Sequence, residues 1–238
     1  VAPGRLSEVF GPDALPNDKL FLGLGIDEAT KKILASVDPD DPAMQLAQAY
    51  LDGINQYIEE GPTPIEFYLT GLDKKPFTLE DVYNSVGYMA FSFAMAHKTD
   101  PFLMEVMDRL GPDYVAELLE SSPSNGTMIR TYDSRFPSDS SHQLSAGIRK
   151  ILEQTPLPAL EGSNSWVLGP DKTKSGKVIL ANDPHIGFAQ PSVWYEAHIV
   201  TPEYEKYGYY LAGVPYPLLG HDRRIAYGLT MFENDDID

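Results

Sequence analysis

The sequence contains no cysteine, and this absence removes several kinds of chemistry at once. Thiol nucleophiles, disulfide bonds and thiolate metal sites are all excluded for this chain. The absence does not identify a compartment, since a cysteine-free protein suits the cytosol and the periplasm equally. A long apolar run is also missing, because no stretch approaches the roughly 18 apolar residues of a membrane-spanning helix.

Basic residues are scarce, with 18 Lys and Arg against 35 Asp and Glu and a net charge of -17. Nucleic acids and anionic membranes would repel such a surface, so neither is expected as a partner. The 238 residues are 42% hydrophobic, which is enough to build a core in one large domain or two small ones. The chain begins at Val1 and stops within an acidic run, and we expect it to be part of a longer protein.

The first half of the chain has the periodicity of helices. Thr78 and Asp81 have the spacing of a capping box, which predicts a helix from Thr78 to about Ala96. That helix is apolar on all sides, which is typical of a buried helix. We expect further helices at 27–36, 43–60, from Asp100-Pro101 to Gly111, 113–120 and 142–154.

The second half changes to short strands with turns between them. Trp166–Leu168 and Lys177–Asn182 are expected to pair, and further strands are expected at 193–201, 207–214 and 224–230. Helices first and strands afterwards predict an α+β fold.

Of the nucleotide-binding and nucleophile motifs considered, only a serine nucleophile activated by its own α-amine fits the sequence. Gly23-Leu24-Gly25 is followed by Glu28, so the third glycine of a dinucleotide-binding loop is absent. The Gly-x-Ser-x-Gly nucleophile elbow is absent as well. A serine can instead be activated by its own α-amine once the peptide bond before it is cut, and Gly162-Ser163 satisfies this requirement. A Gly-Ser pair is common by chance, so the assignment of Ser163 as a nucleophile depends on the surrounding residues.

Those surrounding residues resemble the penicillin acylase family of N-terminal nucleophile hydrolases. The matching stretches are Gly162-Ser163-Asn164-Ser165-Trp166-Val167-Leu168-Gly169, Ala181-Asn182-Asp183-Pro184-His185-Ile186-Gly187, Gly220-His221, Ala226-Tyr227-Gly228-Leu229-Thr230 and Asn234-Asp235-Asp236-Ile237-Asp238. Residues 4–11 resemble a part of the family's small subunit. The resemblance implies a precursor that cuts itself before Ser163, and an αββα sandwich of which this chain holds a part.

The same resemblance implies three regions. Residues 1–124 match the helical small subunit, 125–162 the spacer that is removed, and 163–238 the beginning of the β-rich large subunit. The enzyme class implied is an amide hydrolase acting on linear amides, from the periplasm or the exterior of a bacterium. Its partners would be a small amide substrate and the remainder of its own large subunit.

The resemblance also implies roles for individual residues. Ser163 is the nucleophile, His185 contacts the serine or orients its amine, and the backbone N–H of Met231 stabilises the oxyanion. His185 could instead be a simple turn residue, and His221 is expected to be structural. A second oxyanion donor, an Asn, and a nearby Arg are expected beyond Asp238, so we expect the chain by itself to stay uncut and inactive.

One structural calcium ion is a further implication of the resemblance, although this chain by itself is not expected to hold it. Its ligands would be Asp235, the backbone carbonyl of Ile237, Asp238 and, from the small subunit, Asp100. Two alternatives remain open. The acidic run could be a solvated loop, and Asp100 could be the N-cap of the helix that Pro101 begins.

The substrate can be narrowed only by a few residues. Ala90, Phe93 and Ala94 match the family's acyl pocket, although simple core packing is equally consistent with them. The pocket positions Ile186, Leu218, Leu219 and Leu229 are aliphatic, which favours an aliphatic acyl chain, as in homoserine-lactone acylases, over phenylacetyl. A non-catalytic scaffold is the alternative to an enzyme, and an uncut mature protein would support it.

Overall fold

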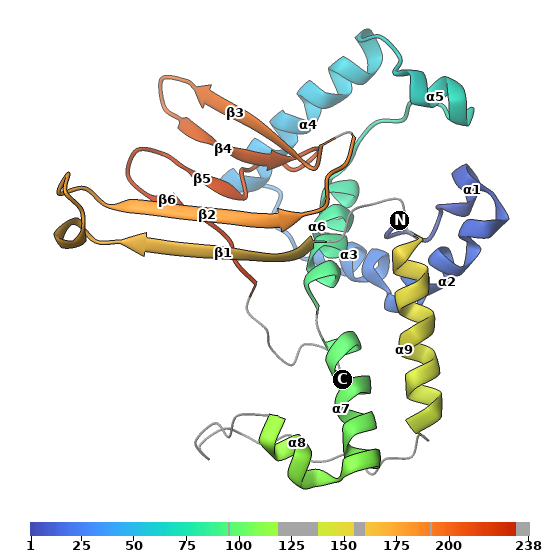
Figure 1. The fold of residues 1–238 in the computed structure, drawn as a ribbon. Helices are drawn as coiled ribbons and strands as arrows, with labels where there is room; N and C mark the ends of the chain where they lie inside the picture. Colours follow the sequence, from blue (N-terminus) through green and yellow to red (C-terminus); the bar gives the residue numbers. More distant parts are fainter. Residues whose placement is uncertain (95, 119–137, 155–159, 191, 232–238) are drawn as a thin grey trace. The chain divides into compact units, whose positions relative to one another are not determined.

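The structure is a computed structural model that describes residues 1–94, 96–118, 138–154, 160–190 and 192–231 (Figure 1). Helices occupy its first half and antiparallel strands its second half, which confirms the predicted α+β class. The chain forms two compact units, residues 1–93 with 156–232 and residues 94–155 with 233–238. The boundaries 1–124, 125–162 and 163–238 remain a prediction, because compactness does not reveal where a chain is cut.

A buried carboxylate joins the first helices, α1 (Ser7–Phe10) and α2 (Leu15–Leu24). Asp18 accepts hydrogen bonds from the backbone N–H of Leu6 at 2.6 Å and of Ser7 at 2.9 Å, and from the Ser7 hydroxyl. Burial alone would raise the pKa of Asp18, but these hydrogen bonds outweigh it and lower the pKa below its usual value. The carboxylate therefore stays charged and holds the start of α1 against α2.

An aromatic cluster forms the centre of the helical part of the first unit. Phe21 of α2 is 1% exposed, and its ring centroid lies 5.6 Å from those of Tyr88 and Phe91 in α6 (Leu79–Phe93). Helix α3 (Ile26–Leu34) also packs on α6. The expectation that α6 is buried on all sides is wrong, since Ala90 is exposed.

Helix α4 (Pro42–Glu60) begins and ends where the sequence predicts. The side chain of Asp41 accepts a hydrogen bond from the backbone N–H of Ala43 at 2.7 Å, and Gly61 follows the last turn. Apolar side chains recur every three or four residues along α4, but Leu51 is 1% exposed whereas Tyr57 is 63% exposed. The buried face of α4 is thus narrower than its periodicity indicates.

The capping box at the start of α6 is confirmed. The backbone N–H of Thr78 donates to Asp81 Oδ2 at 2.8 Å, and the backbone N–H of Asp81 lies 3.3 Å from Thr78 Oγ1. The predicted end of this helix is wrong, because α6 stops at Phe93 and α7 (Ala96–Leu110) begins soon afterwards.

Asp100 and Pro101 lie inside α7 and do not begin it. The N-cap alternative for Asp100 is therefore wrong. The physical reason is that a proline close to a helix start removes only one hydrogen bond, so the helix can begin upstream of it.

The remaining helices are short or lie in the second unit. They are α5 (Ile65–Thr70), α8 (Pro112–Leu118) and α9 (Ser138–Glu153). The last two agree with the helices predicted at 113–120 and 142–154. Within the described part of the chain, none of the helices has the length and hydropathy needed to cross a membrane.

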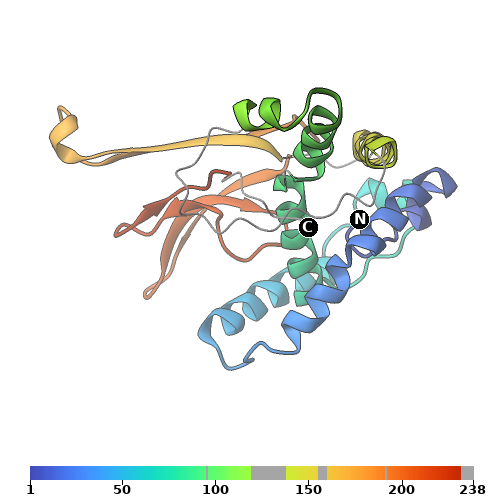
Figure 2. The same ribbon diagram turned by 90° about the horizontal axis from the view of Figure 1, so that it is seen from below.

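The strands form two sheets in the first unit (Figure 2). One is a hairpin of β1 (Leu160–Leu168) and β2 (Ile179–Ile186). The other is antiparallel in the order β3 (Trp194–Val200), β4 (Glu205–Leu211), β5 (Leu219–His221) and β6 (Ala226–Tyr227). The sequence did not predict β5, which has only three residues.

Tyrosines connect α4 to the four-stranded sheet. The hydroxyls of Tyr50 in α4 and Tyr195 in β3 are 2.9 Å apart, and the Tyr216 hydroxyl donates to the carbonyl of Ala43. The ring of Tyr195 stacks on Tyr210, which is 1% exposed, with 5.3 Å between centroids. These contacts join the first helices and the strands within one compact unit.

Candidate active site

The β1–β2 hairpin places the predicted nucleophile beside the second matching motif. In its antiparallel register, Gly162 faces His185, Ser163 faces Pro184 and Asn164 faces Asp183. Paired residues point to the same side of a sheet and successive residues to opposite sides. Ser163 therefore projects from one face of the hairpin, and His185 from the other.

The segment after β6, residues 228–231, lies against Ser163. The backbone N–H of Met231 is 3.3 Å from Ser163 Oγ, and Thr230 Oγ1 is 2.9 Å from the Ser163 carbonyl oxygen. Ser163 and Met231 are thus brought together from opposite ends of the strand region. A backbone donor beside this half-buried hydroxyl oxygen is close to the place where an oxyanion would form if that oxygen added to a carbonyl carbon.

A turn between β5 and β6 leads the chain into the 228–231 segment. Asp222 Oδ1 accepts hydrogen bonds from the backbone N–H of Ile225 at 2.9 Å and of Arg224 at 3.0 Å. These bonds lower the pKa of Asp222 to about 2. Arg223, with φ of 73°, has the left-handed conformation within this turn. The turn is therefore held by its own carboxylate at ordinary pH.

His185 has polar partners, but they lie on its own face of the hairpin. Its Nε2 is 3.3 Å from Asn164 Nδ2 and 3.2 Å from Asp183 Oδ2. Nε2 can accept from Asn164 or donate to Asp183, but a single tautomer cannot do both. The hydrogen bond from His185 lowers the pKa of Asp183.

The expected contact between the His185 side chain and the serine is not found among the described residues. Strand alternation explains this, because it directs the two side chains to opposite faces. A role of the His185 backbone remains a prediction. His221 lies in β5 with its ring 5.2 Å from that of Tyr207, in agreement with packing within the sheet.

Asn182 is a site residue that the sequence did not single out. Its Nδ2 donates to the carbonyls of Asn164 at 2.7 Å and Leu229 at 2.9 Å, while its Oδ1 accepts from the Leu229 N–H at 2.9 Å. Thr230, which contacts Ser163, was not singled out either. Both belong to the matching motifs, but their partners are distant in sequence and leave no local signal.

The structure describes only one of the four proposed calcium ligands. Asp235, Ile237 and Asp238 lie outside the described residues, and Asp100 is an exposed residue of α7 in the second unit. Among the residues that are described, no group of three or more His, Asp or Glu side chains could hold a metal ion. The calcium site remains a prediction.

The residues predicted to line the acyl pocket are dispersed. Ile186 ends β2, Leu218 and Leu219 lie at β5, and Leu229 is 44% exposed beside Asn182. On α6, Ala90 is exposed and Phe93 is half-buried, whereas Ala94, just beyond its end, is buried. Their common role in one acyl pocket remains a prediction.

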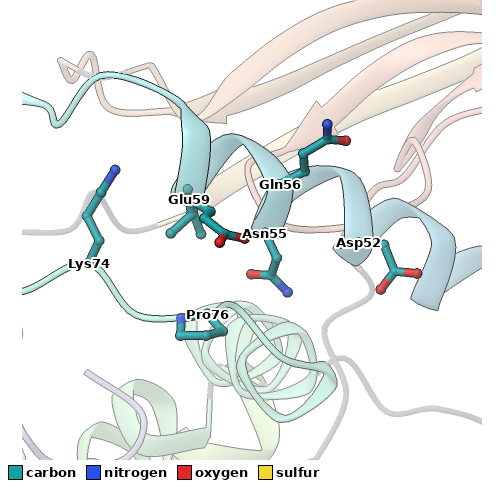
Figure 3. Close-up of a pocket in the computed structure, with 7 residues that line it drawn as sticks. Asp52, Asn55, Gln56, Glu59, Lys74 and Pro76 are labelled. Carbon is teal, nitrogen blue, oxygen red and sulfur yellow. The ribbon is translucent and has the colours of Figure 1, made fainter.

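A pocket of about 580 Å³ lies elsewhere in the first unit, between α4 and the segment that precedes α6 (Figure 3). Its lining residues are Asp52, Asn55, Gln56, Ile58, Glu59, Lys74 and Pro76. None of them is a predicted site residue. Asn55 is used to hold the backbone of Phe77, and Lys74 Nζ donates to the Gly61 carbonyl at 3.1 Å, so both have structural roles.

The chain is similar in sequence to several known acylases. The chain is 25% identical over its whole length to the acyl-homoserine lactone acylase QuiP of Pseudomonas aeruginosa, covering 29% of that protein. Over 96% of its length it is 25% identical to the penicillin acylase 2 proenzyme of Pseudomonas sp., covering 30% of it. Over 99% it is 25% identical to penicillin G acylase of Escherichia coli, covering 34%. The chain therefore spans about a third of the length of these relatives.

A family comparison extends over every residue. The sequence model of the penicillin amidase family matches residues 1–238, so both the helical part and the strands around Ser163 are included. The chain therefore belongs to the penicillin amidase family.

Proposed function

We propose that the full-length protein is an amide hydrolase that cuts itself before Ser163 and then hydrolyses a linear amide through an acyl-enzyme. The observation that carries this proposal is the 3.3 Å separation between the Met231 N–H and Ser163 Oγ. The oxyanion of a tetrahedral intermediate sits on the carbon to which Oγ has added. A donor beside Oγ is therefore within reach of that oxyanion.

Self-cleavage would proceed as an acyl shift from nitrogen to oxygen. Ser163 Oγ adds to the carbonyl carbon of Gly162, the peptide C–N bond breaks, and the Ser163 nitrogen takes up the proton to become a free amine. The resulting ester between Gly162 and Ser163 Oγ is hydrolysed by water. The products are a Gly162 carboxylate and a large subunit that begins with Ser163.

In turnover the new α-amine would act as the base. Its unperturbed pKa is about 7.7–8.0, so a substantial fraction is neutral near pH 7 and can accept the hydroxyl proton. Ser163 Oγ adds to the substrate carbonyl, and the Met231 N–H donates to the oxyanion. The amide C–N bond then breaks, the leaving amine takes the proton, and water hydrolyses the acyl-serine ester to the free acid.

The acyl group is proposed to be aliphatic, with an N-acyl homoserine lactone as the substrate class. The aliphatic side chains of Ile186, Leu218, Leu219 and Leu229 support this, together with the name of the Pseudomonas aeruginosa relative. Penicillin side-chain hydrolysis is the second candidate, supported by the names of the other two relatives. All three relatives are bacterial, and we propose a periplasmic or secreted location.

The function can be tested by intact mass and turnover of the purified full-length protein. We expect two subunits, the larger beginning at Ser163, and hydrolysis of a long-chain acyl homoserine lactone. Apolar pocket contacts are worth about tenfold or more per methylene, so kcat/KM should exceed that for a phenylacetyl anilide by at least about tenfold. An uncut, inactive protein would support the scaffold alternative, whereas a preference for phenylacetyl would contradict only the substrate class.

Calcium is a separate proposal, with Asp235, Ile237, Asp238 and Asp100 as ligands. Bound calcium would relieve repulsion among carboxylates, and ligand linkage predicts a gain of about 2.7 kcal/mol at a hundredfold excess over Kd. The melting temperature of the full-length protein should therefore rise with calcium and fall with a chelator. Asp238→Asn should remove most of this response, while Asp171→Asn, at an exposed position between β1 and β2, should retain it. A melting temperature unaffected by the chelator would contradict the site.

A further inference from the structure

The side-chain amide of Asn182 uses most of its hydrogen-bonding capacity on backbone atoms of two other segments. Both of its donor hydrogens are engaged, one by the Asn164 carbonyl at 2.7 Å and one by the Leu229 carbonyl at 2.9 Å. Its oxygen accepts from the Leu229 N–H at 2.9 Å. The amide thus pairs with both polar backbone groups of Leu229, as a neighbouring strand would.

In the described part of the chain, no strand pairing joins the hairpin to the 228–231 segment. The hairpin and the four-stranded sheet are separate, and residues 228–231 are outside β6. Among the described residues, the hydrogen bonds that join the hairpin to the 228–231 segment come from Asn182 and from Ser163 itself. The amide is therefore the link that is independent of the nucleophile.

The packing around Asn182 is specific to a glycine at position 228. A Cβ built on Gly228 would lie 2.4 Å from Asn182 Oδ1 and 2.8 Å from Asn182 Cβ, which is closer than any real contact. Any larger residue would have to displace the amide from Leu229. The close approach of the segment to the hairpin thus depends on both residues.

The Asn182 amide is hydrogen-bonded to Leu229, which lies two residues before Met231. The backbone N–H of Met231 is in turn 3.3 Å from Ser163 Oγ. Two residues of extended chain span about 7 Å, so Met231 is close enough to Leu229 to be displaced when Leu229 shifts. Hydrogen bonds weaken steeply with distance and angle, so a small displacement would spoil the donor.

We propose that Asn182 is a positioning residue, which holds the 228–231 segment so that the Met231 N–H is aimed at the oxyanion formed at Ser163. This inference rests on the proposed function, because it assigns Asn182 a part in the same reaction. Asn182 does not touch the reacting atoms and acts through the backbone of Leu229.

The chain contains a matched control for this proposal. Asn55 pairs with the backbone of Phe77 in the same way, donating to its carbonyl at 2.9 Å and accepting from its N–H at 2.7 Å. Asn55→Ala therefore removes an equivalent pair of hydrogen bonds between a side-chain amide and the backbone, outside the candidate active site. Both variants should lower the melting temperature, so stability alone does not separate them.

The experiment compares Asn182→Ala, Asn55→Ala and Ser163→Ala in the full-length protein, with a long-chain acyl homoserine lactone and a phenylacetyl anilide as substrates. A displacement near 1 Å costs on the order of a hundredfold, so Asn182→Ala should lower kcat by about that factor. Its KM should stay close to wild type, because the lost interaction acts in the transition state. Self-cleavage, followed by intact mass, should slow as well, whereas Asn55→Ala should keep both rates.

Each result bears on a different statement. Wild-type rates in Asn182→Ala, or an equal fall in Asn55→Ala, would overturn the positioning role. Activity in Ser163→Ala would instead overturn the proposed function. If Asn182→Ala does not fold, Asn182→Asp tests the same point, since it keeps the size and the acceptor but turns a carboxylate toward two carbonyl oxygens. A normal kcat in Asn182→Asp would then overturn the inference.

Discussion

Replacing Ser163 with alanine should leave the full-length protein uncut and inactive. One hydroxyl performs both attacks, first on the carbonyl of Gly162 and later on the substrate, so its removal blocks both reactions. Loss of a nucleophile of this kind costs on the order of 10⁶-fold in kcat. Intact mass should show a single chain, and acyl release should fall by about that factor.

Ser165→Ala is the matched control for this change. Ser165 is an exposed residue two positions further along β1, so the same deletion is made in the same strand without touching the proposed nucleophile. This variant should be cut and should turn over as the wild type does. Two subunits in Ser163→Ala would show that another residue initiates the cleavage.

Met231→Pro should lower kcat by about 10²- to 10³-fold, because proline has no backbone N–H to donate to the oxyanion. The same donor would serve self-cleavage, so the precursor should also accumulate. Met231→Ala keeps the N–H and should keep most of the activity. The comparison of the two variants therefore measures the donor and not the side chain.

The effect of proline on the backbone needs its own control. Proline fixes its own φ and restricts the preceding residue, here Thr230, which also contacts Ser163. Thr230→Ala removes the contact of Thr230 Oγ1 with Ser163 but leaves the backbone unrestricted and the Met231 N–H in place. A loss in Thr230→Ala as large as that in Met231→Pro would attribute the effect to a displaced Thr230. Equal activity in Met231→Pro and Met231→Ala would refute the donor.

Local signals predicted much of the fold correctly. The start of α4 at Pro42 and the capping box of Thr78 and Asp81 are decided by residues within one turn of each other. The pairing of β1 with β2 follows from alternation and the turn between them. Such features depend on neighbours in the chain, which a sequence displays directly.

Local sequence patterns gave wrong predictions where the structure depends on tertiary packing or on partners distant in sequence. Pro101 indicated a helix start, but the helix begins upstream, and Tyr57 follows an apolar period yet is exposed. The three-residue strand β5 forms because β4 and β6 pair with it, and its own residues show no pattern that predicts a strand. The buried carboxylate of Asp18 likewise depends on Leu6 and Ser7 in another helix-forming segment.

The candidate site divides in the same way. The sequence by itself determined the family, the identity of Ser163 as the candidate nucleophile and the choice of Met231 as a donor, because motif matching reads residue types and spacing. Only the tertiary structure decided that the Met231 N–H lies 3.3 Å from Ser163 Oγ and that Asn182 is hydrogen-bonded to Leu229. It also decided that His185 and Ser163 project from opposite faces of the β1–β2 hairpin. The hydrogen bonds among these relations join positions up to 68 residues apart, and one partner in each is a backbone group that every residue possesses, so residue types alone do not reveal them.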